Sequence, residues 1–201
     1  MTRIWLLAAV LSFAAIHGRA QNRWQILIST GMLSPEFIIS QSPNYTLEGT
    51  LLYELPDSTQ ITFCTGIHHW KQNLGPGGTS FRSVPLLVGA QLPFLSGWIS
   101  PYLTGELGLE FLSRQYTFEV YSGSELGLYH LVSSNPATES ATNFAFRFGV
   151  GVAVEVIENL HIDLSTRYER VAYHFDYSYA LIRSKGALEI YGIFIGMALA
   201  L

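Results

Sequence analysis

A short stretch of the chain, residues 143–156, alternates strictly between apolar side chains and small or polar ones. It reads NFAFRFGVGVAVEV, with only Phe and Val at the even-numbered positions. Its odd-numbered positions carry Asn, Ala and Gly together with Arg147 and Glu155. Successive side chains of a β-strand point to opposite faces, so this stretch predicts a strand with one wholly apolar face. A soluble sandwich would bury that face, whereas a membrane barrel would turn it toward lipid.

Seven further stretches alternate in the same way, and the lengths of their connections separate the two architectures. The stretches are 24–32, 44–55, 59–69, 81–92, 98–111, 161–170 and 187–201. Short connections occur at Pro56, Pro93 and Glu158, and they alternate with long ones that begin near Leu33, Trp70, Leu112 and Val171. Short periplasmic turns that alternate with long external loops are typical of membrane barrels. The sequence therefore predicts an all-β fold, an eight-stranded antiparallel up-and-down transmembrane β-barrel with both ends of the chain on the periplasmic side.

Two of the predicted long connections are rich in polar residues, and one predicted strand contains an unusual proline. We expect loops over 112–142, which is rich in Ser, Gly and Thr, and over 171–186, which is aromatic and polar. Pro85 falls inside the stretch 81–92. Because proline cannot donate a hydrogen bond to a neighbouring strand, it predicts a β-bulge near one rim of the barrel.

Charged side chains in the predicted strands share the parity of the non-apolar face, which would point into the barrel. An eight-stranded barrel encloses an interior that side chains just fill, so oppositely charged groups there would pair. We predict a lumen plugged by an ion-pair network of Glu48, Glu106, Glu110, Arg147, Glu155, Asp163, Arg167 and Glu169. A narrow or gated pore, or a ligand site in the barrel mouth, remains open as an alternative.

Aromatic and basic residues gather at the predicted strand ends. Aromatic girdles mark both interfaces of a membrane barrel. We expect one at the periplasmic ends (Trp24, Tyr53, Phe94, Trp98) and one at the external ends (Trp70, Phe81, Tyr116, Tyr173, Phe175, Tyr177). The external ends also carry a basic rim, formed by Lys71, Arg82, Arg114, Arg170, Arg183 and Lys185. Such a rim suits the anionic sugars and phosphates of lipopolysaccharide; loop solubility is the alternative explanation, and the two are compatible.

The amino-terminal segment predicts export. Arg3, an apolar run over 4–16, and the small residues Gly18 and Ala20 together indicate a signal peptide over residues 1–20, followed by a barrel domain over 21–201. Removing Arg3 and Arg19 leaves nine Lys and Arg against fifteen Asp and Glu, a net charge near −6. That balance argues against a nucleic-acid partner. We expect localisation in a bacterial outer membrane as a monomeric barrel in contact with lipid and lipopolysaccharide.

Candidate metal and catalytic groups are few. Cys64 is the only cysteine, so neither an intramolecular disulfide nor a cysteine-rich metal site can form. His68 and His69 are adjacent, and in a strand they would point to opposite faces. His174, Asp176 and Ser178 are the nearest approach to a catalytic set, but their spacing matches no enzyme motif. We expect no cofactor, no metal and no enzymatic activity; an outer-membrane lipid-modifying enzyme is the alternative.

Three stretches carry a family resemblance. They are SVPLLVGAQLPF, with Pro85-Leu86-Leu87; ISPYLTGELGLEF, with Pro101-Tyr102-Leu103; and FRFGVGVAVEV. They resemble the PorT-like and porin-like outer-membrane barrels common in Bacteroidetes-type bacteria. The ending Gly196, Leu199, Leu201 is similar to the carboxy-terminal assembly signal of such barrels, without the usual terminal aromatic residue. The resemblance implies an envelope protein partner and a role as an accessory component of a secretion system, and it brings no catalytic residues.

Overall fold

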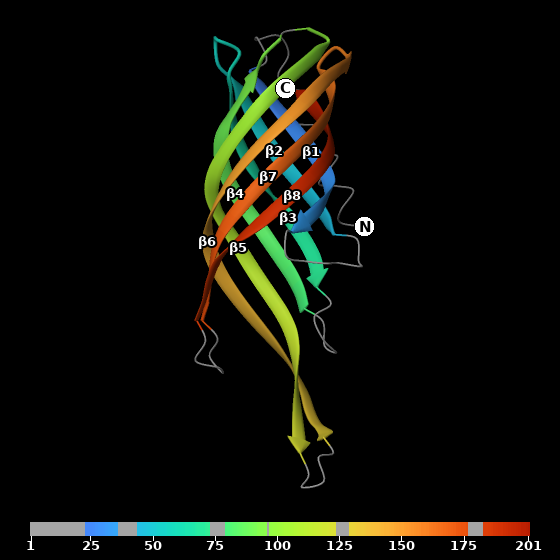
Figure 1. Ribbon diagram of the computed structural model, residues 1–201. Coiled ribbons are helices and arrows are strands. Elements are labelled where there is room, and N and C mark those ends of the chain that lie inside the picture. The colour runs from blue at the N-terminus through green and yellow to red at the C-terminus, as the bar shows by residue number, and fades with distance from the viewer. Residues whose placement is uncertain (1–22, 36–43, 73–78, 96, 124–128, 177–182) are drawn as a thin grey trace.

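The protein forms a single closed β-barrel, with each strand hydrogen-bonded to its neighbours in sequence (Figure 1). The structure is a computed structural model that describes residues 23–35, 44–72, 79–95, 97–123, 129–176 and 183–201. Its strands are β1 (Trp24–Pro35), β2 (Tyr45–Glu54), β3 (Gln60–Gln72), β4 (Thr79–Pro93), β5 (Ile99–Gly123), β6 (Tyr129–Ile157), β7 (Leu160–Asp176) and β8 (Arg183–Ala200).

Closure comes from β1 and β8, which pair antiparallel from Gln25 opposite Ala200 to Pro35 opposite Ile190. The predicted fold class, an eight-stranded antiparallel up-and-down barrel, is therefore confirmed. No helix in the described ranges is long and apolar enough to cross a membrane. The predicted signal peptide over 1–20 lies outside the described residues and stays a prediction.

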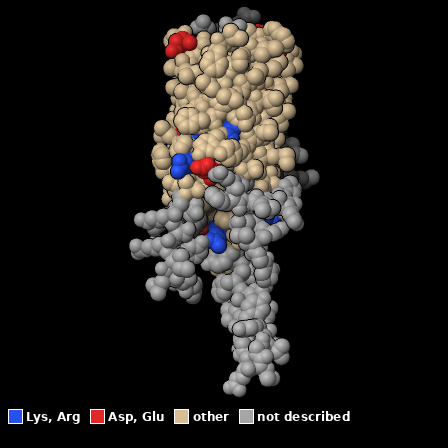
Figure 2. Space-filling view, viewed as in Figure 1, with Lys and Arg blue, Asp and Glu red and all other residues tan. Residues whose placement is uncertain are grey.

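The two faces that the alternation predicts are confirmed along the strands. In β6, Phe148 is 60% exposed on the outside, whereas its neighbour Arg147 is 1% exposed and faces the lumen. The same contrast separates Leu47 from Glu48 in β2. Few charged atoms appear on the barrel wall in Figure 2, and they lie mainly toward its lower part, apart from acidic atoms at the upper rim. An apolar exterior around a polar interior is the arrangement of a membrane barrel.

The short connections hold the chain in tight turns at one end of the barrel. In the turn between β2 and β3, the Asp57 carboxylate accepts hydrogen bonds from the backbone amide and the hydroxyl of Thr59, at 3.2 and 3.1 Å. Ser58 and Asn159 adopt positive φ angles of 68° and 69° in their turns. The start of β1 and the end of β8 lie at this same end, which we call the short-turn end; the opposite end is the long-loop end.

The prediction of a loop over 112–142 was wrong. β5 and β6 stay paired through Gly123 opposite Tyr129. The β4–β5 pairing stops at Tyr116, and the β6–β7 pairing stops at Phe144, so the outer parts of β5 and β6 continue without a full wall around them. Residues 117–123 and 129–136, here called the β5–β6 ribbon, project beyond the barrel (Figure 1). A ribbon that extends beyond the apolar band of the barrel needs no apolar face, so its Ser- and Thr-rich sequence resembled that of a loop.

The predicted loop over 171–186 also proved too long, for a similar reason. β7 continues to Asp176 and pairs there with Arg183 at the start of β8. The polar composition of this segment again concealed a strand pair that extends past the apolar band. Both extended hairpins lie at the long-loop end, so the barrel is taller on that side than the alternation alone indicated.

Pro85 does not create the predicted bulge. The β3–β4 ladder lacks pairs between Thr65 opposite Leu86 and His68 opposite Ser83, yet the register on both sides of this gap is the same. The β4–β5 ladder runs through Pro85 opposite Glu110 without a shift. The missing amide of proline thus interrupts one ladder locally, and no residue is inserted. The register shifts lie elsewhere. One is in the β6–β7 ladder between Glu155 and Ile157, and the other is in the β5–β6 ladder, where Val120 pairs with Ser133 and Tyr121 with Leu131.

Candidate functional site in the barrel lumen

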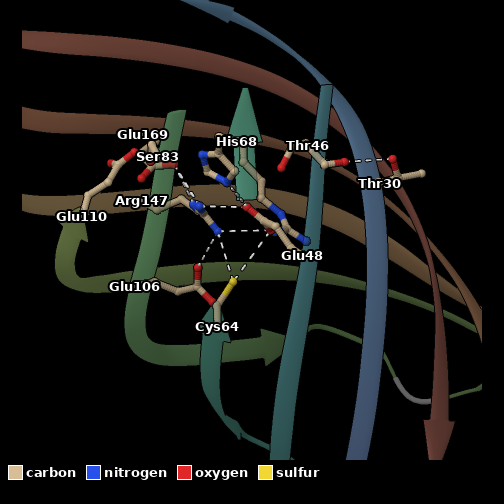
Figure 3. Close-up of polar contacts among 11 residues, drawn as sticks. Thr30, Thr46, Glu48, Cys64, His68, Ser83, Glu106, Glu110, Arg147 and Glu169 are labelled. Atoms are coloured by element: carbon tan, nitrogen blue, oxygen red, sulfur yellow. Dashed lines mark hydrogen bonds and ion pairs between the residues drawn. The ribbon is translucent and has the colours of Figure 1, made fainter. Parts of the chain in front are cut away.

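Arg147 occupies the middle of the lumen and contacts carboxylates from three other strands (Figure 3). Its Nη2 lies 2.9 Å from Glu48 Oε1 and 2.9 Å from Glu169 Oε2, and its Nη1 lies 3.3 Å from Glu106 Oε2. Its Nε donates a second hydrogen bond to Glu169, at 3.2 Å. A guanidinium has five donors in a planar fork, so one arginine can bind several carboxylates at once.

Glu48 is the second centre of this network, and its side chain is fully buried. Besides Arg147, it forms an ion pair with Nη1 of Arg167 and a hydrogen bond with His68 Nε2 at 2.8 Å. The Arg167 guanidinium also lies over the Phe194 ring, 4.3 Å from its centroid, as a cation–π contact. We call the group formed by Glu48, His68, Glu106, Arg147, Arg167 and Glu169 the lumen cluster.

Strand register explains why, within the lumen cluster, Arg147 contacts both Glu106 and Glu169. Arg147 stands directly opposite Glu106 on β5 and opposite Glu169 on β7, and all three share the inward parity. Residues paired across antiparallel strands have their side chains within contact distance. Glu48 comes from β2, which is not a neighbour of β6, so its contact with Arg147 spans the interior of the closed barrel.

Two glycines make room for the charged side chains. A Cβ at Gly66, opposite Glu48 in the β2–β3 ladder, would lie 2.8 Å from the Cγ of Glu48. A Cβ at Gly149, opposite Arg167, would lie 3.1 Å from the Cγ of that arginine. The aliphatic parts of the Glu48 and Arg167 side chains therefore lie directly on the backbone of these glycines. This close packing lets long side chains fit into a narrow lumen.

Two smaller polar contacts lie beside the lumen cluster. The Ser83 hydroxyl donates a hydrogen bond to Glu110, whose carboxylate lies next to that of Glu169 (Figure 3). The Tyr102 hydroxyl donates a hydrogen bond of 2.6 Å to Asp163 Oδ2, toward the short-turn end. Sequence reasoning missed Tyr102 and Ser83, although both lie on the inward parity of their strands. Their inward position was the available signal.

An apolar layer also fills part of the lumen. Its buried members are Leu33, Cys64, Trp70, Leu87, Leu112, Ala145, Val171, Ile190 and Phe194. Trp70 is 0% exposed and stacks on Phe81, with ring centroids 5.4 Å apart. The prediction that Trp70 and Phe81 belong to an external aromatic girdle was therefore wrong. β3 continues to Gln72, so Trp70 keeps the inward parity of His68, whereas the sequence had placed it at the start of a loop.

Of the remaining residues predicted to form the aromatic girdles, the structure describes the side chains at the short-turn end but not those at the long-loop end. Trp24 and Tyr53 pack against each other at the short-turn end, with ring centroids 4.6 Å apart and ring planes tilted by 52°, and Phe94 and Trp98 are exposed near the same end. At the long-loop end, the side chains of Tyr116, Tyr173, Phe175 and Tyr177 lie outside the described part of the structure. Aromatic residues thus gather at the short-turn end, whereas for the external girdle only the placement of these four residues stays a prediction.

Seven of the eight residues predicted to line the lumen are buried there. Glu48, Glu106, Arg147, Arg167 and Glu169 meet in the lumen cluster, while Glu110 and Asp163 make the two neighbouring contacts. Glu155 is different, because it is exposed at the end of β6 beside the register shift. Its inclusion in the network was wrong: the inward parity persists to Glu155, but the barrel wall ends there.

The predicted basic rim divides into outward and inward members. Lys71, Arg82 and Arg170 are exposed near the long-loop end, and Arg170 Nε lies 3.9 Å from Glu189 Oε1. Arg114 instead has the inward parity and is half-buried, with its guanidinium 6.0 Å from the centre of the Phe81 ring. The side chains of Arg183 and Lys185 lie outside the described part of the structure.

The candidate metal and catalytic residues do not form a site among the described side chains. His68 is buried in the lumen, whereas His69 faces outward and stacks on Tyr45 with centroids 5.0 Å apart, as their adjacent positions predicted. Within the described ranges, no group of three His, Cys, Asp or Glu side chains could hold a metal ion. The side chains of His174, Asp176 and Ser178 lie outside the described part.

Comparison with solved structures finds the same architecture in outer-membrane proteins. The crystal structure of Neisserial surface protein A (NspA) matches with a TM-score of 0.58 and 14% identity, covering 89% of this chain and 97% of that one. The crystal structure of a major outer membrane protein from Thermus thermophilus matches with a TM-score of 0.52 and 12% identity, covering 88% and 98%. At such identities the likeness is one of fold. The chain is therefore an eight-stranded β-barrel of the architecture found in these outer-membrane proteins.

No protein-family model matches the sequence, and no curated protein matches it either. The PorT-like resemblance thus rests on the three sequence stretches alone.

Proposed function

We propose that this protein is integral to a bacterial outer membrane and acts there as a closed structural and interaction barrel. The support for a membrane setting is physical. Large apolar side chains cover the outside of every strand, while carboxylates and guanidinium groups lie inside. Exposing this surface to water would present an apolar patch far larger than soluble monomers carry. The fold shared with outer-membrane barrels supports the same setting.

The lumen cluster is the observation that carries the proposal of a closed barrel. Arg147 contacts Glu48 across the interior, and it also contacts Glu106 and Glu169 on the neighbouring strands. The contact between Arg147 and Glu48 connects opposite walls, and the apolar layer around Phe194 fills the space beside the lumen cluster. A lumen of eight strands is narrow enough for side chains to fill. We therefore favour a structural plug over the narrow-pore alternative.

Planar-bilayer recording tests the plug. The folded protein is expected to give no steady conductance, because an ion would have to break several buried ion pairs to pass. A double substitution, Arg147→Ala with Glu48→Ala, removes the contact between opposite walls and should produce a measurable current. Arg170→Ala with Glu189→Ala removes an exposed pair of the same type and should behave like the unmodified protein. Steady current through the unmodified protein would refute the plug and favour the narrow pore.

The interaction part of the proposal rests on the long-loop end. The β5–β6 ribbon projects beyond the wall, and Lys71, Arg82 and Arg170 are exposed near the same end. Basic groups at this height can pair with the phosphates of lipopolysaccharide. Replacing Lys71 and Arg82 by Ala should weaken binding to lipopolysaccharide micelles. Arg23→Ala, at the opposite end of the barrel, is the matched control. Equal binding by all variants would contradict lipopolysaccharide contact at this rim.

We also propose that the protein has an envelope protein partner, and this part of the proposal draws on the PorT-like resemblance. In the structure, Pro85 lies in β4 opposite Glu110, and Pro101 lies in β5 opposite Val152, so the two motifs that carry the resemblance belong to adjacent strands of the wall. We propose that the ribbon is the surface that a secretion component would contact. Copurification with envelope proteins that is lost on shortening the ribbon supports this idea, and copurification that is unchanged contradicts it.

We propose no enzymatic role. The alternative, a lipid-modifying enzyme, would use Ser178 as the nucleophile with His174 and Asp176 beside it. Lipid A from cells that produce the protein should have the same acyl chains as lipid A from cells that lack it. A difference between them that disappears with Ser178→Ala would establish the enzyme instead.

A further inference from the structure

A cavity of about 340 Å³ lies at the short-turn end of the barrel, separate from the lumen cluster. The turn residues Ser58, Phe94 and Leu95 line its outer side, and inward-facing residues of the strands line the rest. Its volume falls at the lower end of the range for small-molecule sites. The proposed plug does not use the residues that line this cavity.

Asp163 closes the inner side of this cavity with a buried carboxylate. The residue is 3% exposed, and its Oδ2 accepts the 2.6 Å hydrogen bond from the Tyr102 hydroxyl. Its other oxygen, Oδ1, has no hydrogen-bond partner among the described residues. Ser165 lies within reach of this carboxylate, and its hydroxyl is likewise buried without a hydrogen-bond partner among the described residues. Arg167 also lies nearby, but it is engaged by Glu48. A buried carboxylate oxygen without a donor is costly, which favours a ligand that supplies one.

The rest of the lining has the character that a cationic ligand with an aliphatic stem requires. Glu54 adds a second carboxylate, and His161 is the only residue of the described lining that could carry positive charge. The side-chain amides of Gln25, Gln60 and Gln91 provide further oxygen acceptors, of which the Gln60 oxygen is buried without a partner among the described residues.

An apolar floor completes the site. Leu27, Leu52 and Ala198 form a small buried cluster on the cavity wall, away from the main apolar layer. Gly196 stands opposite Asp163 in the β7–β8 ladder, so no side chain from β8 covers the carboxylate at that position. An ammonium group at Asp163 would thus have apolar surface beside it for a methylene chain.

We propose that this cavity binds a primary ammonium group on a short aliphatic chain, with Asp163 as its buried anchor and Glu54 as a second, outer carboxylate. The ligand enters from the short-turn end, which faces the periplasm in the proposed orientation. A free aliphatic diamine and a lysine side chain of a periplasmic protein offer the same chemistry. This inference goes beyond the structural role, since a plugged lumen would leave the cavity accessible from that side.

The test uses the full barrel folded in detergent micelles, with methyl NMR signals of Leu27, Leu52 and Ala198 as the readout. Butane-1,4-diamine and a short peptide with one central lysine are titrated separately, and butane-1,4-diol is the neutral control for the diamine. We expect saturable shifts with at least one of the two amines and none with the diol. Saturation by the diamine alone identifies a free amine as the ligand, and saturation by the peptide alone identifies a protein lysine.

Three substitutions make the assignment specific. Asp163→Asn should weaken amine binding by about tenfold or more, because hydrogen bonds to charged groups contribute about 1.5–3 kcal/mol. Glu54→Gln should weaken it less, and it covers the case in which Asp163→Asn does not fold. Glu155→Gln, an exposed carboxylate at the same end outside the cavity lining, should leave binding unchanged. The proposal is overturned if neither amine saturates the signals, if the diol binds equally well, or if Glu155→Gln weakens binding as much as Glu54→Gln.

Discussion

Removing Arg147 should be among the most destabilising single changes in this barrel. We consider Arg147→Met, which keeps much of the length and volume of the side chain and removes its charge. Glu48 would retain Arg167 as a partner, but Glu106 and Glu169 would lose the arginine that stands opposite each of them. Breaking a buried ion pair by deleting one partner costs about 3–5 kcal/mol, because the remaining charge stays buried without compensation.

That cost is large compared with the whole stability of a typical domain, about 5–15 kcal/mol. Urea titration of the barrel in lipid vesicles, followed by tryptophan fluorescence, measures it. Arg170→Met is the matched control, since its pair with Glu189 is 3.9 Å long and partly exposed. Exposed pairs of that kind contribute about 0–1 kcal/mol, so the control should unfold close to the unmodified protein.

A rescue experiment separates charge from packing. Adding Glu106→Gln and Glu169→Gln to Arg147→Met removes the orphaned charges and should recover most of the lost stability, because neutral replacement of a buried ionic group is often tolerated. The reasoning is refuted if Arg147→Met lies within about 1 kcal/mol of the unmodified protein, as an exposed pair would. It is also refuted if the triple variant is no more stable than the single one.

Three further predictions concern the wall. Val150→Arg places a charge on the outer face of β6 and should cost about 2–4 kcal/mol in lipid vesicles at mid-membrane depth; an unchanged urea midpoint would contradict a lipid-facing β6. Gly66→Val should lower the folded yield, because even a Cβ at this position would lie 2.8 Å from Glu48 Cγ. Gly49→Val is the control, since it has open space and should fold. Heat-modifiable gel mobility measures both yields, and equal yields would argue against close packing at Gly66. Replacing residues 117–136 by a short turn should preserve heat-modifiable mobility, since the ribbon pairs with no other strand; loss of folding would show that the ribbon stabilises the barrel.

The wall of the barrel could be predicted from sequence because its physical cause is local. A strand that contacts lipid on one side and packed side chains on the other must alternate, as residues 143–156 do. The same parity placed Arg147, Glu106 and Glu169 in one lumen, and the register of the strands then sets Arg147 opposite both carboxylates. Beyond the apolar band of the barrel this requirement disappears, and there the predictions from sequence were wrong. The segment that forms the β5–β6 ribbon was predicted to be a loop. Trp70 was predicted to lie at the membrane interface, although it packs inside the barrel.

The centre of the site depended on information that no local pattern contains. Glu48 reaches Arg147 across the closed barrel, and that contact depends on the closure of β1 on β8 and on how the strands are offset around the wall. Tyr102 reaches Asp163 in a similar way, from β5 to β7. Parity alone assigned Glu155 to the same network, but it could not show that the wall ends before that residue.

The reactivity of Cys64 tests the closed lumen most directly, because this single cysteine lies within the lumen. Its Sγ is 3.4 Å from Arg147 Nη1 and 3.7 Å from Glu48 Oε2, and the residue is buried. The folded barrel in vesicles is treated with a small charged thiosulfonate, first from outside and then from both sides. The closed lumen predicts no modification until the protein is unfolded in urea, and faster modification in the Arg147→Ala variant. If Cys64 in the folded protein without substitutions reacted as fast as it does in the unfolded chain, that result would contradict a plugged barrel.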